Sequence, residues 1–153
     1  MARQSEPQPQ GARSRVIVVD TTVWIDLLNA RDTPHVRHLN ALVGAGEIVI
    51  GDLMLCEILQ GLKNERSARE VEGWLRRFDI VSMAGDAIAV AAARNFRMLR
   101  SRGITIRQTI DLFIGTWCIE NRLPLLHNDR DYRPMALHLG LTEVQVTPSD
   151  QPG

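Results

Sequence analysis

The chain has 153 residues, of which 44% are hydrophobic and 24% charged, and this is the composition of one ordinary globular domain. No apolar run approaches the roughly 18 residues that span a bilayer, so we expect no membrane association. The formal net charge is zero, and the bulk composition therefore lacks the basic excess that is typical of nucleic-acid-binding proteins.

The two ends of the chain are predicted to lie outside the folded domain. Residues 1–14 are polar, contain prolines and lack the apolar stretch of a secretory signal, which favours a disordered N-terminal extension. The domain is predicted to cover residues 15–148, and residues 149–153 are expected to form a flexible C-terminal tail.

The first part of the domain is predicted to contain one strand and two helices. Residues 16–19 form a short β-branched run that predicts a buried strand ending before Asp20, and the threonines that follow are expected to cap a helix. A second helix is predicted to begin after Thr33-Pro34 and to end at the glycines of residues 44–46.

The central part of the domain repeats this alternation. Residues 48–50 predict a strand, residues 53–62 and 65–78 predict two helices, and residues 80–81 predict a third strand. An Ala-rich helix is predicted over residues 86–102. Five arginines and no acid occur between residues 87 and 110, which is equally typical of a solvated helix face and of a phosphate-contacting patch.

The last part of the domain completes the pattern. Thr109 is expected to cap a helix, residues 123–126 predict a strand, residues 134–139 a short helix and residues 144–146 a final strand. Because strands and helices alternate throughout, we predict an α/β fold: a three-layer α/β/α sandwich with a central, mainly parallel sheet.

The cysteines and tryptophans are interpreted as core residues. Cys56 and Cys118 lie within apolar helical patterns and are expected to be buried, reduced thiols, which favours a cytoplasmic protein. Trp24, Trp74 and Trp117 fall on apolar faces and are predicted to pack in the core rather than to stack on bases.

Four acidic residues are notable for their positions. Asp20 follows the first strand and Asp129 follows a later one, so both are expected at the carboxyl edge of the sheet, where open α/β sheets place their sites. Glu57 interrupts an apolar segment, and Asp111 lies in the first turn of a helix. Taken singly, each acid has an ordinary explanation as a cap, a partner of the helix dipole or a solvent-exposed residue.

Taken together, these four carboxylates predict a divalent metal site. Carboxylates gathered in one crevice repel each other unless a cation supplies the opposing charge, and Mg²⁺ and Mn²⁺ prefer oxygen ligands. The sequence has no Cys/His set suited to zinc, and His35 and His38, three apart without a third ligand, are expected at the surface.

Four segments of the chain resemble the signature stretches of PIN-domain nucleases, and of VapC-type toxins in particular. These are residues 18–26 (VVDTTVWID), 56–61 (CEILQG), 110–115 (IDLFIG) and 125–132 (LLHNDRDY), in the order that the family has. The resemblance covers about residues 16–146, and the first segment with its Trp is its most specific part.

The resemblance implies which residues form the site. The metal-binding and catalytic quartet would be Asp20, Glu57, Asp111 and Asp129, supported by the hydroxyl of Thr21 or Thr22. Asp131 could join or replace the last acid, because that position varies in the family. His127 could touch the substrate or be an ordinary loop residue, and it departs, with Asn128, from the Thr-containing version of this segment. Asp26 and Asp52 are assigned to helix-surface or capping roles.

The resemblance also implies an activity and partners. It implies an endoribonuclease that uses a metal-activated water to cleave RNA, leaving 5′-phosphate and 3′-hydroxyl ends. It further implies the toxin of a toxin–antitoxin pair, with a cognate antitoxin protein as partner and a tendency to form homodimers.

Two alternative functions remain at this point. A catalytically silent PIN module would bind RNA or protein on the same scaffold, although intact acids at all four positions count against it. A haloacid-dehalogenase-like phosphatase would also have an Asp after its first strand, but it needs a second Asp where Thr22 stands and a downstream Lys, and the only lysine is Lys63.

Overall fold

The structure, a computed structural model, describes residues 16–44 and 47–148. The predicted extension over residues 1–14 and the predicted tail over residues 149–153 lie outside the described residues. Within the described ranges, the structure contains no helix long and apolar enough to cross a membrane.

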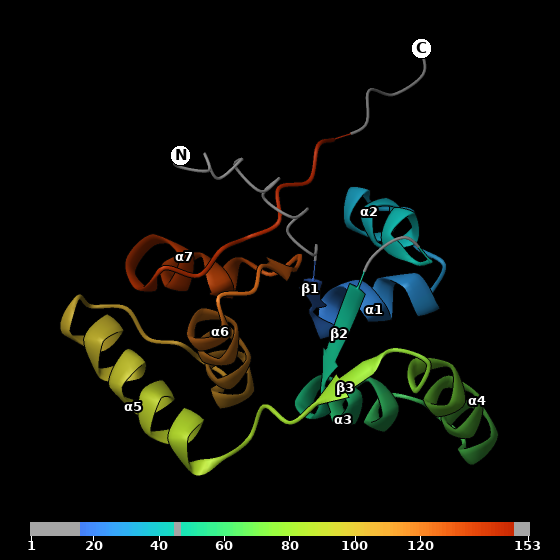
Figure 1. Ribbon diagram of the computed structural model, residues 1–153, viewed down its shortest axis with the longest axis horizontal. Coiled ribbons are helices and arrows are strands. Elements are labelled where there is room, and N and C mark those ends of the chain that lie inside the picture. Colours follow the sequence, from blue (N-terminus) through green and yellow to red (C-terminus); the bar gives the residue numbers. More distant parts are fainter. Residues whose placement is uncertain (1–15, 45–46, 149–153) are drawn as a thin grey trace, which may run out of the picture.

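In the described part of the chain, four parallel strands form one sheet in the order β3-β2-β1-β4 (Figure 1). They are β1 (Val16–Val19), β2 (Glu47–Gly51), β3 (Asp79–Val81) and β4 (Leu125–Leu126). β1 pairs with β2 on one side and with β4 on the other, and Val18 is in register with both Val49 and Leu125. Because all strands run the same way, their carboxyl ends meet at one edge of the sheet.

Helices cover both sides of this sheet. They are α1 (Thr21–Leu28), α2 (Pro34–Leu42), α3 (Asp52–Gln60), α4 (Glu65–Leu75), α5 (Asp86–Ser101), α6 (Thr109–Asn121) and α7 (Arg133–Leu139), and a 3₁₀ turn, η1 (Arg130–Tyr132), precedes the last helix. Figure 1 shows α5, α6 and α7 on one side of the sheet and α1 to α4 on the other. The predicted α/β/α sandwich with its parallel central sheet is therefore confirmed.

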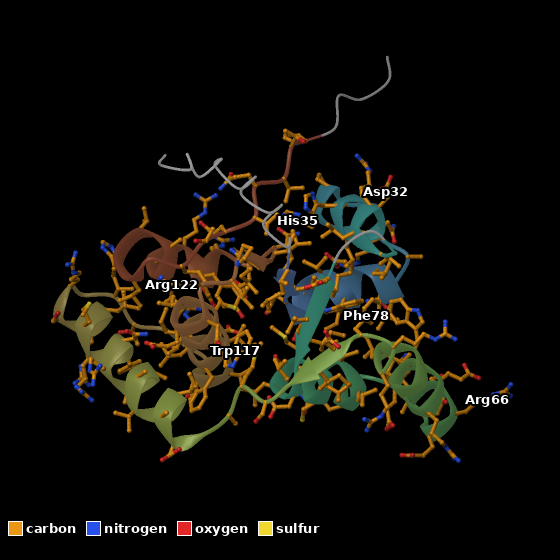
Figure 2. All side chains as sticks on the ribbon, in the orientation of Figure 1. Asp32, His35, Arg66, Phe78, Trp117 and Arg122 are labelled. Atoms are coloured by element: carbon orange, nitrogen blue, oxygen red, sulfur yellow. The ribbon has the colours of Figure 1, made fainter. Side chains whose placement is uncertain are left out.

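The hydrophobic core lies between the sheet and the two helix layers. Trp24 is fully buried, and its ring nitrogen donates a hydrogen bond to the Val19 carbonyl at 3.1 Å. Its ring packs against Trp74 and Phe78, with ring centroids 5.6 and 5.2 Å away. Trp117, on α6 in the other layer, packs against the core as well (Figure 2). The tryptophans thus have the core role predicted for them.

The predicted threonine caps are wrong at both helices. Asp20 is the N-cap of α1, and its carboxylate accepts a hydrogen bond from the Thr22 amide at 3.1 Å. Thr109 is already inside α6, and Gln108 before it makes no side-chain capping bond. At the first helix, Asp20 rather than a threonine accepts the Thr22 amide, because a carboxylate is a stronger hydrogen-bond acceptor than a hydroxyl.

The strands of the C-terminal part are shorter than predicted. Residues 144–146 do not form a strand: Glu143 makes an isolated parallel bridge with Leu125, and the Val144 amide donates to the Leu125 carbonyl at 3.0 Å before the chain leaves the sheet. β4 begins at Leu125 rather than at residue 123, since Pro124 has no amide hydrogen to donate to a neighbouring strand.

Cys118 is buried, as predicted, but Cys56 is exposed. The buried face of α3 is formed by Met54 and Ile58, which are four residues apart. Cys56 lies midway between them in sequence and therefore points to the opposite face, since successive helical residues are rotated by about 100°. Both thiols are free.

Candidate functional site

The carboxylate of Asp20 lies at the carboxyl end of β1 and is held on several sides. Its Oδ2 accepts hydrogen bonds from the Thr22 amide at 3.1 Å and from the Thr22 hydroxyl at 2.7 Å. Its Oδ1 accepts a bond of 2.8 Å from the Tyr132 hydroxyl. The residue is only 3% exposed. The sequence therefore places a buried, oriented carboxylate at the sheet edge.

Glu57 approaches this point from α3. It is half-buried, and its Oε1 accepts a hydrogen bond of 3.0 Å from the hydroxyl of Thr21, a buried residue at the start of α1. Burial and the negative charge of Asp20 raise the pKa of Glu57, while the Thr21 hydrogen bond opposes that rise. The sequence did not decide whether Thr21 or Thr22 supports the site. In the structure both do, Thr21 through Glu57 and Thr22 through Asp20.

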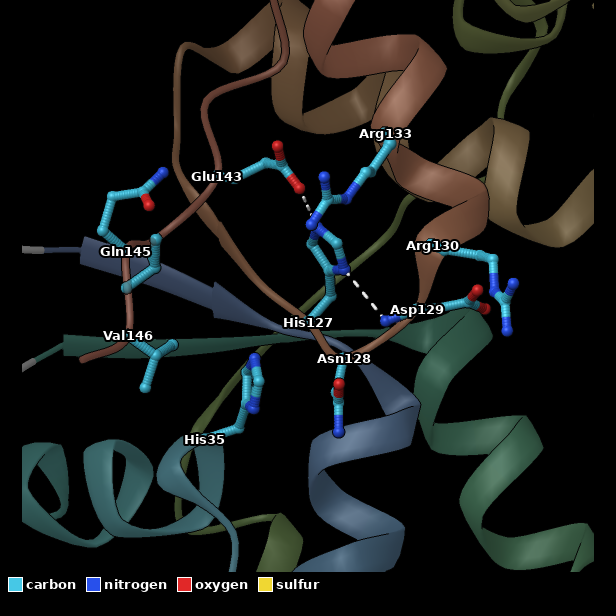
Figure 3. A pocket seen from close by; sticks show the side chains of 10 residues that line it. His35, His127, Asn128, Asp129, Arg130, Arg133, Glu143, Gln145 and Val146 are labelled. Atoms are coloured by element: carbon cyan, nitrogen blue, oxygen red, sulfur yellow. Dashed lines mark hydrogen bonds and ion pairs between the residues drawn. The ribbon is translucent and has the colours of Figure 1, made fainter. Parts of the chain in front are cut away.

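Asp129 reaches the site on the loop that follows β4, and that loop is held by an unexpected pair. The His127 Nδ1 accepts a hydrogen bond from the Asp129 amide at 3.1 Å, and its Nε2 lies 2.6 Å from Glu143 Oε2 (Figure 3). Because Nδ1 is the acceptor, the ring proton lies on Nε2 and is donated to Glu143. His127 is therefore a buried support of the loop rather than an ordinary polar loop residue.

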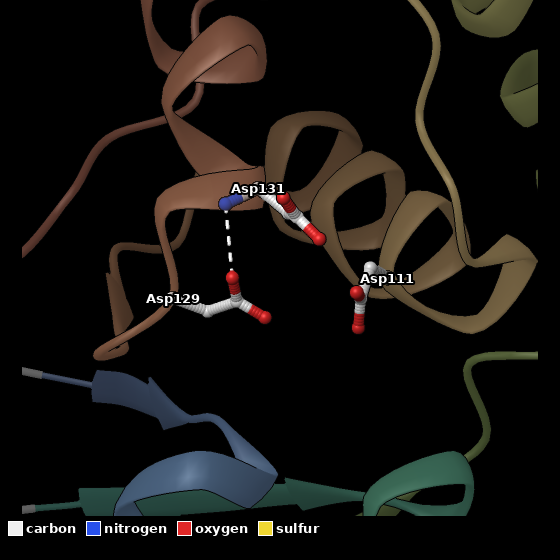
Figure 4. Close-up of side chains that lie close together, drawn as sticks. All are labelled: Asp111, Asp129 and Asp131. Atoms are coloured by element: carbon white, nitrogen blue, oxygen red, sulfur yellow. Dashed lines mark hydrogen bonds between the residues drawn. The ribbon is translucent and has the colours of Figure 1, made fainter.

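Asp111, in the first turn of α6, faces the acids of this loop. Oxygen atoms of Asp111, Asp129 and Asp131 all lie within 4.8 Å of one another (Figure 4). The Asp129 Oδ1 also accepts the Asp131 amide at 2.9 Å, which turns the chain into η1. The structure therefore brings Asp131 next to the predicted acids instead of choosing between it and Asp129.

The other three predicted acids lie close enough to Asp111 for their charges to act on it. The pKa of Asp111 is raised from its ordinary value of 3.8 to about 7, first by burial and then by the negative charges of Asp20, Asp129 and Glu57. Asp111 is only 8% exposed. Within the described residues, no lysine or arginine forms an ion pair with any of the four. We call these four residues the acid cluster.

Tyr132 is the residue of this site that the sequence did not reveal. Its fully buried side chain donates to Asp20, and its hydroxyl lies 3.4 Å from Asp111 Oδ1. Burial and the charge of Asp20 raise its pKa well above the ordinary value, so the hydroxyl stays protonated and remains a donor. Nothing in the sequence distinguishes Tyr132 from an ordinary core aromatic residue. Only the fold shows where its hydroxyl points.

The residues assigned elsewhere do lie outside the acid cluster. Asp26 pairs with Arg31 at 3.5 Å, and its side chain is half-buried rather than on the helix surface. Asp52 accepts the amides of Leu53 and Met83 at 2.9 and 2.8 Å at the start of α3. His35 is half-buried rather than on the surface, and it lines a pocket beside the loop of Asp129.

The arginines between residues 87 and 110 are exposed, and two of them contact neighbouring side chains. The Arg100 guanidinium lies 5.6 Å from the centre of the Phe96 ring, and Arg102 contacts the His138 ring at 3.1 Å.

Known proteins resemble this chain in sequence and in fold. Ribonuclease VapC17 of Mycobacterium tuberculosis is 29% identical over 122 residues, which are 76% of this chain and 89% of that protein. Ribonuclease VapC11 of the same organism is 25% identical over 124 residues, with 79% and 92% covered.

Two solved structures show the same fold. VapBC2 from Rickettsia felis, bound to a DNA fragment from its promoter, superposes with a TM-score of 0.68 at 17% identity, covering 84% of this chain and 97% of that one. VapC20 of Mycobacterium tuberculosis, described as a toxin that cleaves the Sarcin-Ricin loop, has a TM-score of 0.60 at 19% identity, with 84% and 98% covered.

The PIN domain is the family whose sequence profile matches residues 17–136. The match covers well over half of the chain and includes the whole acid cluster. This chain therefore belongs to the PIN domain family.

Proposed function

We propose that this protein is a Mg²⁺- or Mn²⁺-dependent endoribonuclease and the toxin of a toxin–antitoxin pair. The observation that carries the proposal is the acid cluster, in which carboxylates from four separate elements share one partly buried space. Burial and the charges of the neighbouring acids make the ionised cluster unfavourable in the metal-free protein, as the raised pKa of Asp111 indicates, and a divalent cation would offset the negative charge.

The residues present fit such an ion. Mg²⁺ and Mn²⁺ prefer oxygen ligands and keep several waters, and Asp111, Asp129 and Asp131 offer oxygens within 4.8 Å of one another. We assign metal binding and catalysis to Asp20, Glu57, Asp111 and Asp129, with Asp131 beside them. A bound ion would supply Lewis acidity, which lowers the pKa of a coordinated water and offsets the charge of the phosphodiester.

The chain's own residues prepare this chemistry. Thr22 and Tyr132 fix the two oxygens of Asp20, so that carboxylate does not need to reorient when a cation binds. Thr21 orients Glu57, and His127 fixes the backbone of Asp129. Pre-oriented ligands of this kind are what a metal site requires of its supporting residues.

The relatives suggest the partners. Several solved structures with this fold are named VapBC, and one of them is described as a member of the VapBC family of toxin–antitoxin systems. For this chain we propose RNA as substrate, a cognate antitoxin protein as inhibitor, a homodimer as assembly and the cytoplasm as location. Membership of the PIN family removes the haloacid-dehalogenase alternative.

A cleavage assay tests the proposed activity. Purified protein should leave a mixed-sequence RNA intact in excess EDTA, cleave it when Mg²⁺ or Mn²⁺ is restored, and cleave it poorly with Ca²⁺, whose looser coordination positions a water less well. Mapping of the new ends should find 5′-phosphates. RNA binding without cleavage under any of these metals would instead identify a silent binding module.

A matched pair of variants tests the site. Glu57→Gln removes a charge from the acid cluster and should abolish most cleavage. Glu72→Gln makes the same change on α4, where Glu72 forms an exposed pair with Arg76, and should cleave as wild type does. Equal rates in the two variants, or full activity in EDTA, would refute the assignment.

A further inference from the structure

A polar pocket of about 330 Å³ adjoins the acid cluster on the far side of the Asp129 loop. Its walls come from three distant parts of the chain: His35 from α2, His127 to Arg130 with Arg133 from the loop and its following helix, and residues 143–146 from the C-terminal segment (Figure 3). We call it the His127 pocket. Asp129 belongs both to this pocket and to the acid cluster, so one ligand could extend from one into the other.

Two arginines in the pocket wall are available to a ligand. Arg130 lies on the Asp129 side of the pocket and Arg133 on the Glu143 side (Figure 3). Over the described ranges, neither guanidinium has an ion-pair partner, although Arg31, Arg66 and others on the surface do. A planar guanidinium is the side chain best suited to bind phosphate oxygens. The carboxylates of Asp129 and Glu143 also line the pocket, and Glu143 is already held by His127, so the two arginines are the groups that an anionic ligand would contact.

His35 gives the pocket a second, neutral contact. Its Nδ1 is buried and has no hydrogen-bond partner among the described residues, and its ring extends from α2 toward His127 (Figure 3). A buried polar nitrogen without a partner is unfavourable. A ligand in the pocket would reach this atom once the His35 ring turns and brings Nδ1 to the pocket surface. Burial lowers the pKa of His35, so the ring is neutral and suits a base or ribose better than a phosphate.

The floor of the pocket is rigid. The His127 ring is held by Glu143 at 2.6 Å and by the Asp129 amide at 3.1 Å, and it packs on Tyr132 with centroids 4.8 Å apart. The ring that lines the pocket is therefore tied to the backbone of one predicted metal ligand and to the tyrosine that holds another. A group seated here would lie at a fixed place relative to the acid cluster.

We propose that the His127 pocket is a subsite for the nucleotide next to the scissile phosphodiester, in which Arg130 and Arg133 contact a phosphate and His35 contacts the base or ribose. The inference rests on the proposed ribonuclease function and deepens it. The volume fits, because small-molecule sites begin near 300 Å³. RNA is favoured over an acidic protein segment as the occupant because Asp129 lines the pocket and also belongs to the acid cluster that would hold the neighbouring phosphate.

The histidines provide a direct test that needs no catalysis. The four nucleoside 5′-monophosphates are titrated into metal-free protein in EDTA while the histidine ring signals are followed by NMR. The chain has four histidines, and assignment uses single histidine variants. The signals of His35 and His127 should shift and saturate for at least one nucleotide, while that of His138, which is outside the pocket, should stay in place.

Matched arginine variants sharpen this test. Arg133→Gln and Arg130→Gln should each raise the dissociation constant of the nucleotide at least about tenfold. Arg66→Gln, a change at the far end of α4, should leave it unchanged (Figure 2). Absence of any shift at His35 and His127, or shifts of the same size with inorganic phosphate alone, would overturn the nucleotide subsite. An unchanged His138 signal verifies that each variant is folded.

Cleavage kinetics separate this inference from the function on which it rests. With Mn²⁺ and an RNA oligonucleotide, Arg133→Gln should raise KM about tenfold with kcat and the metal requirement nearly unchanged. If wild type cleaves RNA while Arg133→Gln has the same KM and no nucleotide binds, the subsite is wrong and the function stands. If nucleotides bind in the pocket but wild type cleaves no RNA with any metal, the pocket is a nucleotide-binding site and the proposed function is wrong.

Discussion

Asp20 and Asp52 occupy matching positions in the fold. Each directly follows one of two paired parallel strands, β1 and β2, and each lies at the start of the next helix. Asp52 accepts hydrogen bonds from the amides of Leu53 and Met83, so its carboxylate joins two backbone segments. Asp20 instead accepts bonds from Thr22 and from Tyr132, and it faces the other acids of the cluster.

The difference shows that position at the carboxyl edge of a sheet does not by itself make a site. What decides is the group that lies across from the carboxylate. Asp52 is bonded to the amides of two separate backbone segments, which makes it structural. Asp20 also accepts an amide, that of Thr22, but its negative charge acts on Asp111, and a cation between them would offset that repulsion. The same residue type at equivalent places should therefore respond in opposite ways to the same mutation.

The largest expected effect is on catalysis. Asp20→Asn should lower kcat/KM for RNA cleavage by more than about 100-fold, because it removes a charge from the proposed metal site. The variant should fold, since Asn keeps the shape and its amide can face the Tyr132 hydroxyl. Asp52→Asn, the matched change after β2, should leave cleavage per folded molecule close to wild type. Comparable losses in both variants would remove the distinction between the two regions.

The next effect concerns pH and the stability of the metal-free protein. The pKa of Asp111 is about 7 in the folded protein and 3.8 ordinarily, so between these values the folded state keeps a proton that the unfolded chain has lost. Stability in EDTA should therefore fall as the pH rises, by at most about 1.4 kcal/mol for each pH unit in this window. Between pH 5 and pH 8, the free energy of unfolding measured with urea should fall by about 2 kcal/mol in wild type. It should not show this fall in Asp111→Asn.

The comparison of these two proteins isolates Asp111, because Glu57 and His35, whose pKa values also shift, are present in both. Mg²⁺ or Mn²⁺ at pH 8 should restore the lost stability in wild type, and it should raise the stability of Asp111→Asn by less. Parallel pH profiles for the two proteins would show that the acid cluster is not under electrostatic strain.

Asp52 should show the opposite behaviour in a stability measurement. Asp52→Ala leaves the partly buried amide of Met83 without its hydrogen-bond acceptor. This should lower the free energy of unfolding by about 1–3 kcal/mol. The loss should not depend on divalent metal. A matched control is Asp79→Ala at an exposed position in β3, which should change stability little. If the stability lost in Asp52→Ala did depend on divalent metal, Asp52 would contribute to the metal site and the distinction between Asp20 and Asp52 would be wrong.

These two regions also show what a single sequence can predict. The alternation of β-branched runs with helical patterns was enough for the sheet, and the four acids were found because their neighbours or their strand ends made them unusual. The roles of Thr21 and Thr22 could be predicted only as support for the site. Which acid each hydroxyl contacts depends on how α1 and α3 pack, and that is not a local property.

Other features could not be predicted because they depend on direction in space. Cys56 lies in an apolar run, but the packing of α3 through Met54 and Ile58 turns it outward. His127 and Glu143 are sixteen residues apart and meet only because the C-terminal segment runs parallel to β4 beside Leu125. Neither the pocket nor its rigid floor has a signature in the order of residues.

The smallest predicted effect is that of a change at Tyr132, whose hydroxyl donates a hydrogen bond that orients the Asp20 carboxylate. Its hydroxyl donates to Asp20 Oδ1 at 2.8 Å from a fully buried position, so Tyr132→Phe keeps the packing and removes one bond. A residue that orients a metal ligand typically changes metal affinity by about 10–100-fold. Because Thr22 still holds the other oxygen of Asp20, we expect the low end: about tenfold more Mn²⁺ for half-maximal cleavage, with the maximal rate largely kept. A structural role alone would lower the melting temperature without changing the Mn²⁺ titration, and that result would leave Tyr132 as a core residue whose hydroxyl is incidental.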